Sequence, residues 1–178
     1  MTREIIIAGF GGQGVMSMGK TLVEAGMAEG YNVSWVPSYG PEMRGGTANC
    51  AVVISDEPVG SPLVVQPNEL IAMNGPSLKK FEPHVEEGGL ILVNSSQALE
   101  KVHRTDVRAF YVPSMEEAGK LGNFKVANMV MLGAYIAATG ALKMETLEQM
   151  LSHIFTGSKA PLVALNIQAL QAGSAHIK

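Results

Sequence analysis

The stretch EIIIAGFGGQGVMSMGKT, Glu4–Thr21, decides the fold class of this chain. Its first part, EIIIAGF, is a short apolar run rich in isoleucine, which is typical of a buried strand in a parallel sheet. Glycines follow at once, and the residues from Gly14 to about Glu29 are predicted to form a helix that ends at Gly30. A strand, a glycine turn and a helix in this order indicate an α/β fold.

Two nucleotide-binding patterns overlap in this stretch. Gly9, Gly11 and Gly14 match G-x-G-x-x-G, and the residues from Gly14 to Thr21 match the P-loop pattern G-x-x-x-x-G-K-T. A P-loop begins directly after its strand, whereas four residues separate the strand from the helix here, so Lys20 is expected to lie inside the helix. The dinucleotide pattern has the right context, but the next predicted strand lacks an acidic residue for a ribose. The loop is therefore predicted to contact an anion or a partner through its backbone, with a stand-alone dinucleotide-binding oxidoreductase as the alternative from a different class.

The remaining apolar runs alternate between strands and helices before the chain turns helical. Further strands are predicted at 32–37, ended by Pro37, and at 47–55, 69–74, 88–96 and 106–113. Helices are predicted after Pro76, from a capping box of Ser114 and Glu117, and at 125–140, 144–155 and 161–173. The expected fold is one α/β domain with a mostly parallel sheet flanked by helices and a helical C-terminal third. The turns 9–14, 38–46 and 94–96 should then meet at the carboxyl edge of the sheet.

The composition excludes several classes of function. The chain has 178 residues, a net charge of -3 and scattered basic residues, so no nucleic-acid surface is expected. Its one cysteine, Cys50, allows neither an internal disulfide nor an iron–sulfur cluster held by this chain alone. Residues 126–142 carry no charge, but they are too few and too diluted by polar residues for a membrane span, so a buried helix is expected. No secretory leader is recognised, and the protein is expected to be cytoplasmic.

No catalytic constellation is visible in the sequence. The four histidines lie far apart, no G-x-S-x-G motif supplies a nucleophile, and Cys50 is predicted to be inert core. We therefore predict neither a catalytic residue nor a metal site in this chain.

Other features indicate contact with a partner. The segment SYGPEMRGG at 38–46 presents Tyr39 and Arg44, which are interface residue types, and an arginine on a glycine-rich turn can bind a carboxylate or phosphate with two hydrogen bonds. Asn128, inside an apolar helix, is expected either to satisfy the core or to hold a neighbouring loop. Four methionines fit either the core or an adaptable partner surface: Met16, Met18, Met129 and Met131.

Three segments together carry a resemblance: GFGGQGV at 9–15, SYGPEMRGG at 38–46 and GNFKVANMVMLGA at 122–134. Over nearly its full length the chain resembles the gamma subunit of 2-oxoacid:ferredoxin oxidoreductases, which has such segments in this order and at this spacing. The YGPEMRGG form is similar to that of the 2-oxoglutarate or branched-chain enzymes. The pyruvate enzyme, which tends to carry RRGAP, and the small subunit of indolepyruvate:ferredoxin oxidoreductase, which usually carries HGMSQRGG, remain alternatives.

The resemblance implies one gamma-type domain over residues 1–178 and an auxiliary role in a larger enzyme. That enzyme would oxidatively decarboxylate a 2-oxoacid, with 2-oxoglutarate as the first choice, to acyl-CoA, CO₂ and reduced ferredoxin. The complex would use thiamine diphosphate, Mg²⁺, iron–sulfur clusters and coenzyme A, none of them bound by this chain alone, so the isolated chain should be inactive. The implied partners are the alpha, beta and ferredoxin-like delta subunits and ferredoxin, while self-association of the isolated chain stays open. The implied contact edge for a partner or an anion comprises Gly9, Gly11, Gly12, Gln13, Gly14, Tyr39, Glu42, Arg44 and Asn128.

Overall fold

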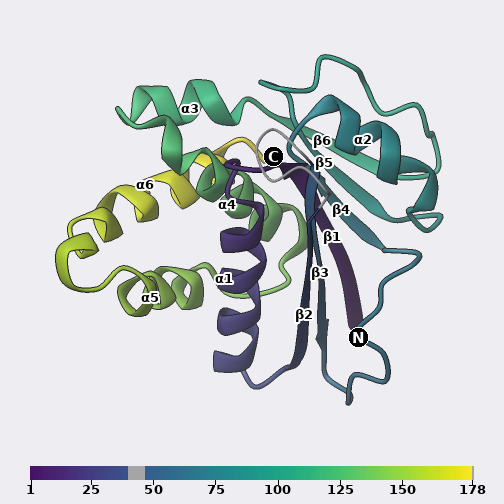
Figure 1. Cartoon of the computed structure of the whole chain (residues 1–178), viewed down its shortest axis with the longest axis horizontal. Helices are drawn as coiled ribbons and strands as arrows, with labels where there is room; N and C mark the ends of the chain where they lie inside the picture. Colours follow the sequence, from purple (N-terminus) through teal and green to yellow (C-terminus); the bar gives the residue numbers. More distant parts are fainter. Residues whose placement is uncertain (40–46, 178) are drawn as a thin grey trace.

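The computed structural model describes residues 1–39 and 47–177, with only the backbone of Tyr39. One six-stranded sheet with the order β2-β3-β1-β4-β5-β6 forms the centre of the molecule (Figure 1). β3 pairs antiparallel with both β1 and β2, and all other pairings are parallel, so β3 alone among these six strands runs against the rest. The strands are β1 Thr2–Phe10, β2 Asn32–Tyr39, β3 Thr47–Ser55, β4 Glu69–Ala72, β5 Leu90–Asn94 and β6 Arg108–Val112.

Helices cover the two faces of this sheet unequally. The helices α1 and α4 pack on one face, with α5 and α6 outside them, and the short α2 lies on the other face (Figure 1). The α-helices are α1 Val15–Ala28, α2 Gly75–Phe81, α3 Ser114–Lys120, α4 Ala127–Thr139, α5 Met144–Ile154 and α6 Leu162–Ala175. Short 3-10 turns form at Glu82–His84, Phe124–Val126 and Gly157–Lys159. These elements confirm the predicted single α/β domain with a mostly parallel sheet and a helical C-terminal third.

The strand β1 is buried on both faces, which explains its continuous apolar sequence. Ile5 and Ile7 pack into the cluster beneath α1 and α4, whereas Ile6 and Ala8 pack into the cluster beneath α2. Because successive side chains of a strand point to opposite faces, a strand covered on both sides must be apolar at every position.

The predicted end of β2 at Pro37 was wrong. β2 continues to Tyr39, and Pro37 lies opposite Cys50 within the ladder. β2 is the outermost strand of the sheet, so a residue without an N–H can be tolerated where no further strand needs a donor.

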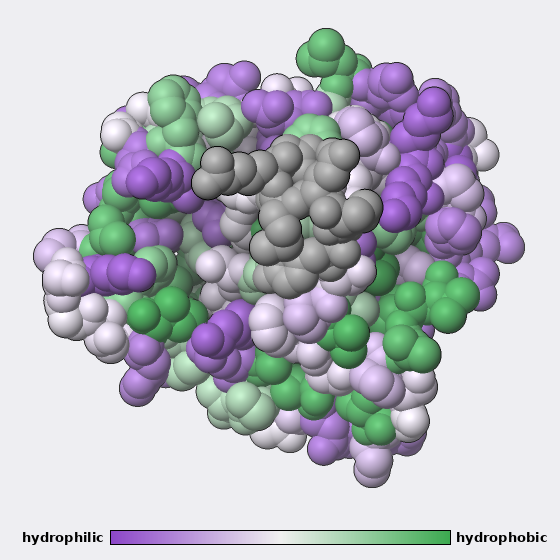
Figure 2. All heavy atoms as spheres, in the orientation of Figure 1, coloured by the Kyte–Doolittle hydropathy of each residue, from purple (hydrophilic) through white to green (hydrophobic). Residues whose placement is uncertain are grey.

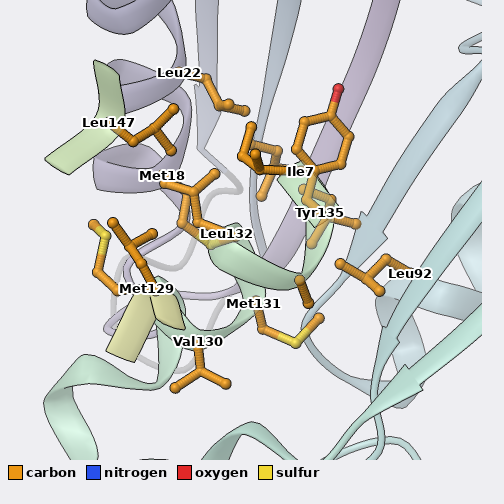
Figure 3. Close-up of a cluster of buried hydrophobic side chains, with 14 of the residues drawn as sticks. Ile7, Met18, Leu22, Leu92, Met129, Val130, Met131, Leu132, Tyr135 and Leu147 are labelled. Carbon is orange, nitrogen blue, oxygen red and sulfur yellow. The ribbon is translucent and has the colours of Figure 1, made fainter. Parts of the chain in front are cut away.

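Helix α4 forms the core of the helical layer, as predicted for the uncharged segment. Residues 127–136 are all buried, and Figure 3 shows Met131, Leu132 and Tyr135 of α4 packed among side chains of α1 and the sheet. No helix in the part of the chain that the structure describes is long and apolar enough to cross a membrane. Three of the four singled-out methionines are buried and the fourth is partly buried against the same cluster, so they serve the core: Met18, Met129, Met131 and Met16.

Two predicted helix stops are confirmed, and one predicted capping box is not. Gly30 and Gly140 follow α1 and α4 with φ of 89° and 62°, the left-handed conformation that glycine adopts without steric cost. The predicted capping box of Ser114 and Glu117 does not form, because the Ser114 hydroxyl donates to Oδ1 of Asn94 at 2.7 Å instead.

Candidate functional site

A cavity of about 620 Å³ lies at the carboxyl ends of the parallel strands. The β1–α1 turn contributes Gly12, Gln13 and Gly14 to its lining, the end of β5 contributes Asn94, and the first turn of α4 contributes Asn128. The structure thus brings the turns 9–14 and 94–96 together, as the strand order along the chain predicted. The third turn of that prediction, 38–46, lies largely outside the described residues.

Gln13 holds the glycine turn in place. Its Oε1 accepts hydrogen bonds from the backbone N–H of Phe10 at 2.7 Å and from Nδ2 of Asn74 at 2.9 Å. Its Nε2 donates to the carbonyl of Met73 at 3.4 Å. One carboxamide therefore ties the end of β1 to the end of β4, and the turn is fixed relative to the sheet.

A second carboxamide connects the next strand to the same point. Nδ2 of Asn94 donates to the Met73 carbonyl at 3.1 Å, and Oδ1 accepts from Ser114 and, at 3.3 Å, from the backbone N–H of Ser96. Because Asn94 is 1% exposed, these bonds also satisfy polar atoms that water cannot reach.

Asn128 reaches from α4 to the start of α1. Its Nδ2 donates to the carbonyl of Gly14 at 3.3 Å, and its Oδ1 accepts from the backbone N–H of Met129 at 2.9 Å. A Cβ on Gly14 would overlap this carboxamide, and Gly14 has φ 75°. Asn128 was predicted either to satisfy the core or to hold a neighbouring loop. The structure shows a hydrogen bond of the second kind, to Gly14 of the β1–α1 turn.

Gly9 also depends on close packing. A Cβ there would lie 2.9 Å from Cβ of Met73 and would also crowd Gln13. Gly11 and Gly12 are exposed, and a Cβ on Gly12 would meet no neighbour, but the φ of 92° at Gly12 would strain any other residue. Six predicted contact residues thus form one continuous region: Gly9, Gly11, Gly12, Gln13, Gly14 and Asn128. Glu42, Arg44 and the Tyr39 side chain lie outside the described residues.

The described lining of the cavity is suited to binding and carries no acid–base pair. Among the described residues that line it, Lys125 carries the only charge, and apolar walls come from Met115, Phe155 and Leu162. No group of three or more His, Cys, Asp or Glu side chains that could hold a metal ion occurs within the described ranges. On the side of the molecule drawn in Figure 2, apolar residues form several separate groups among polar ones. The cavity therefore indicates a binding site more clearly than any of these surface groups does.

The structure also bears on the two nucleotide patterns. Lys20 is exposed on α1, beyond the first turn of the helix, so it does not approach the β1–α1 turn as a P-loop lysine would. The strand after α1 is separated from β1 by β3, whereas in the dinucleotide fold that strand lies next to β1 and carries the acidic residue. Both observations agree with the reading of the turn as a backbone contact site.

Several lining residues were missed at the sequence level. Phe124, Leu162 and Asn166 come from the helical third and meet the glycine turn only through the packing of α4 and α6. The one available signal was the GNFK segment ahead of α4, where an aromatic residue follows a glycine and an asparagine and precedes a lysine, all residue types common on surfaces.

Cys50 is buried against α1, away from any reactive environment. Its Sγ contacts the carbonyl of Val15 at 3.7 Å, and burial raises the pKa of the thiol from 9.0 to about 11. A raised pKa keeps the neutral thiol dominant at neutral pH, in line with the prediction of an inert core cysteine.

We expect two measurable consequences for Cys50. The native chain at pH 8 should react with a thiol reagent much more slowly than the chain in denaturant.

The same thiol should make the free energy of unfolding depend on pH. It ionises near pH 9 in the unfolded chain and near pH 11 in the folded one, so the neutral buried thiol contributes its full stability below pH 9. About 3 kcal/mol of stability should be lost between pH 9 and pH 11, because the unfolded chain releases its proton first. Urea titrations from pH 8 to pH 11 should show this loss in the native protein and a shallower one in Cys50→Ala; equal slopes would contradict it.

Comparison with known proteins identifies the family. The model of the family "pyruvate ferredoxin/flavodoxin oxidoreductase" matches residues 4–176. The ketoisovalerate oxidoreductase subunit VorA of Methanothermobacter thermautotrophicus is 48% identical over 94% of this chain, but the chain spans 35% of that subunit's length. The 2-oxoglutarate synthase subunit KorC of Methanothermobacter marburgensis is 36% identical, with 97% of this chain and 95% of that subunit covered.

A solved structure has the same fold at nearly equal length. The keto/oxoacid ferredoxin oxidoreductase gamma subunit from Geobacter sulfurreducens has a TM-score of 0.84 and 31% identity, with 98% of this chain and 97% of that chain covered. The chain therefore belongs to the pyruvate ferredoxin/flavodoxin oxidoreductase family and is similar along nearly its whole length to a gamma subunit of that family.

Proposed function

We propose that this chain is the auxiliary gamma subunit, or gamma-type domain, of a 2-oxoacid:ferredoxin oxidoreductase. The observation that carries the proposal is the family match over residues 4–176, together with similarity to a gamma subunit of nearly equal length. The enzyme would oxidise and decarboxylate a 2-oxoacid, transfer the acyl group to coenzyme A and pass the electrons to ferredoxin.

The residues of this chain do not fit the redox and thiamine cofactors of such an enzyme. An iron–sulfur cluster needs about four thiolates, and the chain has one cysteine, which is buried. The described residues also contain no cluster of carboxylates or histidines that could hold Mg²⁺ for a diphosphate. We therefore assign thiamine diphosphate, Mg²⁺ and the clusters to the alpha, beta and ferredoxin-like delta subunits, and we derive no chemical step within this chain.

The chain's own contribution is a preorganised contact edge. The carboxyl edge of the sheet is held rigid by Gln13, Asn94 and Asn128, so its glycine turn keeps one shape before a partner binds. Preorganisation reduces the entropy lost on association, because the turn does not have to be ordered by the partner. We place the catalytic subunits, and with them the coenzyme A side of their active site, against this edge.

The identity of the 2-oxoacid that the enzyme uses is the more specific part of the proposal. The sequence favoured 2-oxoglutarate with branched-chain 2-oxoacids as the alternative, and the similarity to the 2-oxoglutarate synthase subunit at nearly equal length supports the first choice. The 48% identity to a ketoisovalerate oxidoreductase subunit supports the branched-chain alternative more strongly. Residues of the catalytic subunits should decide between them.

Reconstitution tests the proposed function. The catalytic subunits should be co-expressed with and without this chain, and coenzyme A-dependent viologen reduction should be measured with 2-oxoglutarate and with 2-oxoisovalerate. We expect a stable complex whose activity falls by about tenfold or more when this chain is omitted. Equal activity without the chain would refute the auxiliary role, and stabilisation of the isolated chain by micromolar NAD would favour the dinucleotide-binding alternative.

A further inference from the structure

Two exposed glycines form the tip of the β1–α1 turn. Gly11 and Gly12 have no side chains that could pack against the rest of the molecule, and Gly12 has φ 92°. A glycine segment samples many backbone conformations unless its ends are fixed. The shape of the tip therefore depends on how firmly Phe10 and Gln13, which flank these glycines, are held.

Gln13 closes the turn on Phe10 with two hydrogen bonds. The backbone N–H of Gln13 donates to the Phe10 carbonyl at 3.2 Å, and Oε1 of Gln13 accepts from the Phe10 N–H at 2.7 Å. The second bond requires the oxygen of the carboxamide to face Phe10, because the carboxamide nitrogen is itself a donor. A group that holds the Gln13 carboxamide in this orientation therefore stabilises the closed turn.

Asn74 sets that orientation from a buried position. Its Oδ1 accepts from the backbone N–H of Ser77 at 2.9 Å, as the N-cap of α2, so its Nδ2 faces the turn and donates to Oε1 of Gln13 at 2.9 Å. The Gln13 oxygen thus lies between two donors, and a reversed carboxamide would place its nitrogen there instead. Asn74 is 1% exposed and is not among the described residues that line the cavity, so it acts on the contact edge through Gln13.

The bond between Asn74 and Gln13 joins two helix starts on opposite faces of the sheet. Asn74 begins α2 and Gln13 precedes α1, and these helices cover opposite faces (Figure 1). The Met73 carbonyl accepts from Gln13 at 3.4 Å and from Asn94 at 3.1 Å. Loss of the bond from Asn74 would therefore release the turn and leave the link between Asn94 and Met73 in place.

We propose that Asn74 is a positioning residue of the contact edge, which through Gln13 holds the glycine turn in the shape that the catalytic subunits bind. This inference rests on the proposed function, because it assigns a role in partner binding at the same edge. A turn that is ordered before association loses less entropy when the partner binds. Breaking the bond should therefore lower the affinity for the catalytic subunits, although the buried Asn74 does not reach them itself.

Asn74→Ser and Asn68→Ser form a matched pair of variants. Serine is about as good an N-cap as asparagine, so Asn74→Ser keeps a cap for α2 but loses the Nδ2 donor to Gln13. Asn68 joins β4 to β1 at the opposite edge of the sheet, where its Oδ1 accepts from the N–H of Glu4 at 3.0 Å and its Nδ2 donates to the Thr2 carbonyl at 3.1 Å. Both variants thus remove a carboxamide between the same two strands, but only one acts on the glycine turn.

Each chain should be titrated into the catalytic subunits while coenzyme A-dependent viologen reduction is recorded with the 2-oxoacid that the native complex uses. For Asn74→Ser we expect the half-maximal concentration to rise by about fivefold or more, with a maximal activity within about twofold of the native value. Saturation restores activity because a higher concentration of the chain offsets the cost of ordering the turn. Asn68→Ser should stay within about twofold of the native chain in both quantities. Thermal unfolding should show that both variants are folded at the assay temperature.

A double-mutant cycle shows whether Asn74 acts through Gln13. Added to Gln13→Ala, Asn74→Ser should change the half-maximal concentration by less than about twofold, because the bond that it breaks is already absent. Gln13 is half-buried, and Gln13→Ala alone removes the same bond, so it tests the turn even where Asn74→Ser does not fold.

Four results would overturn the inference and leave the proposed function intact. They are a native half-maximal concentration in Asn74→Ser or in Gln13→Ala, equal shifts for Asn74→Ser and Asn68→Ser, an equal shift for Asn74→Ser with and without Gln13→Ala, and a lowered maximum at the native half-maximal concentration. A native chain that does not raise the activity of the catalytic subunits at any concentration would refute the proposed function itself.

Discussion

Gly133→Ala is expected to destabilise the fold by about 3 kcal/mol or more, because the added methyl group meets backbone on the facing helix. A Cβ at Gly133 of α4 would overlap the carbonyl oxygen of Leu170 in α6. The contact is reciprocal, since a Cβ at Gly173 of α6 would overlap the carbonyl oxygen of Val130 in α4. Neither backbone can rotate away as a side chain would, so the two helices must separate and expose the core around α4.

Urea unfolding followed by Trp35, the one tryptophan of the chain, provides the measurement. Gly173→Ala should have an effect of similar size, because it disrupts the same helix contact. Gly75→Ala is the control: it also lies in a helix, its φ is not positive, and a Cβ there has no neighbour within 4 Å. A midpoint for Gly133→Ala equal to that of Gly75→Ala would show that the helices do not approach as closely as described.

Arg3→Met is expected to cost about 3 to 5 kcal/mol, because it removes one partner of a buried ion pair. The Arg3 guanidinium pairs with the carboxylate of Glu69, and these side chains are 19% and 7% exposed. The hydroxyl of the fully buried Tyr135 donates to the other oxygen of the same carboxylate. Arg3 also donates to the carbonyl of Thr139 at 3.3 Å, so the cluster joins β1 and β4 to the end of α4.

The triple variant Arg3→Met, Glu69→Met, Tyr135→Phe separates the charge effect from packing. It replaces every member of the cluster by an apolar residue of similar size, so no buried charge or hydroxyl is left without a partner. We expect it to regain most of the stability lost in Arg3→Met. Thermal and urea unfolding should both be measured; a triple variant that is less stable than Arg3→Met would contradict this account of the cluster.

The order of strands and helices could be predicted because it depends on local patterns. The isoleucines of β1, the glycines after it and the stops at Gly30 and Gly140 each act within a few residues. The rule that parallel strands present their carboxyl ends at one edge was enough to bring Gln13 and Asn94 together.

The errors have a common cause in longer-range contacts. Pro37 ends a strand by local preference, but β2 lies at the edge of the sheet and continues past it. Ser114 is a residue type that caps helices, but its hydroxyl donates to the buried Asn94 at the end of β5 instead. The place of a strand in the sheet decides the first case, and in the second a hydrogen bond to a residue distant in the sequence outweighs a local capping preference of about 1 kcal/mol.

The sequence by itself determined the fold class, the family and the absence of cysteines for an iron–sulfur cluster, because composition and local motifs carry that information. Only the tertiary structure decided that β3 lies between β2 and β1, since strand pairing joins residues far apart in the chain. It also decided that Asn166 and Phe124 share a cavity with the glycine turn. The reason is the close approach of α4 and α6 through Gly133 and Gly173, which no periodicity in either helix specifies.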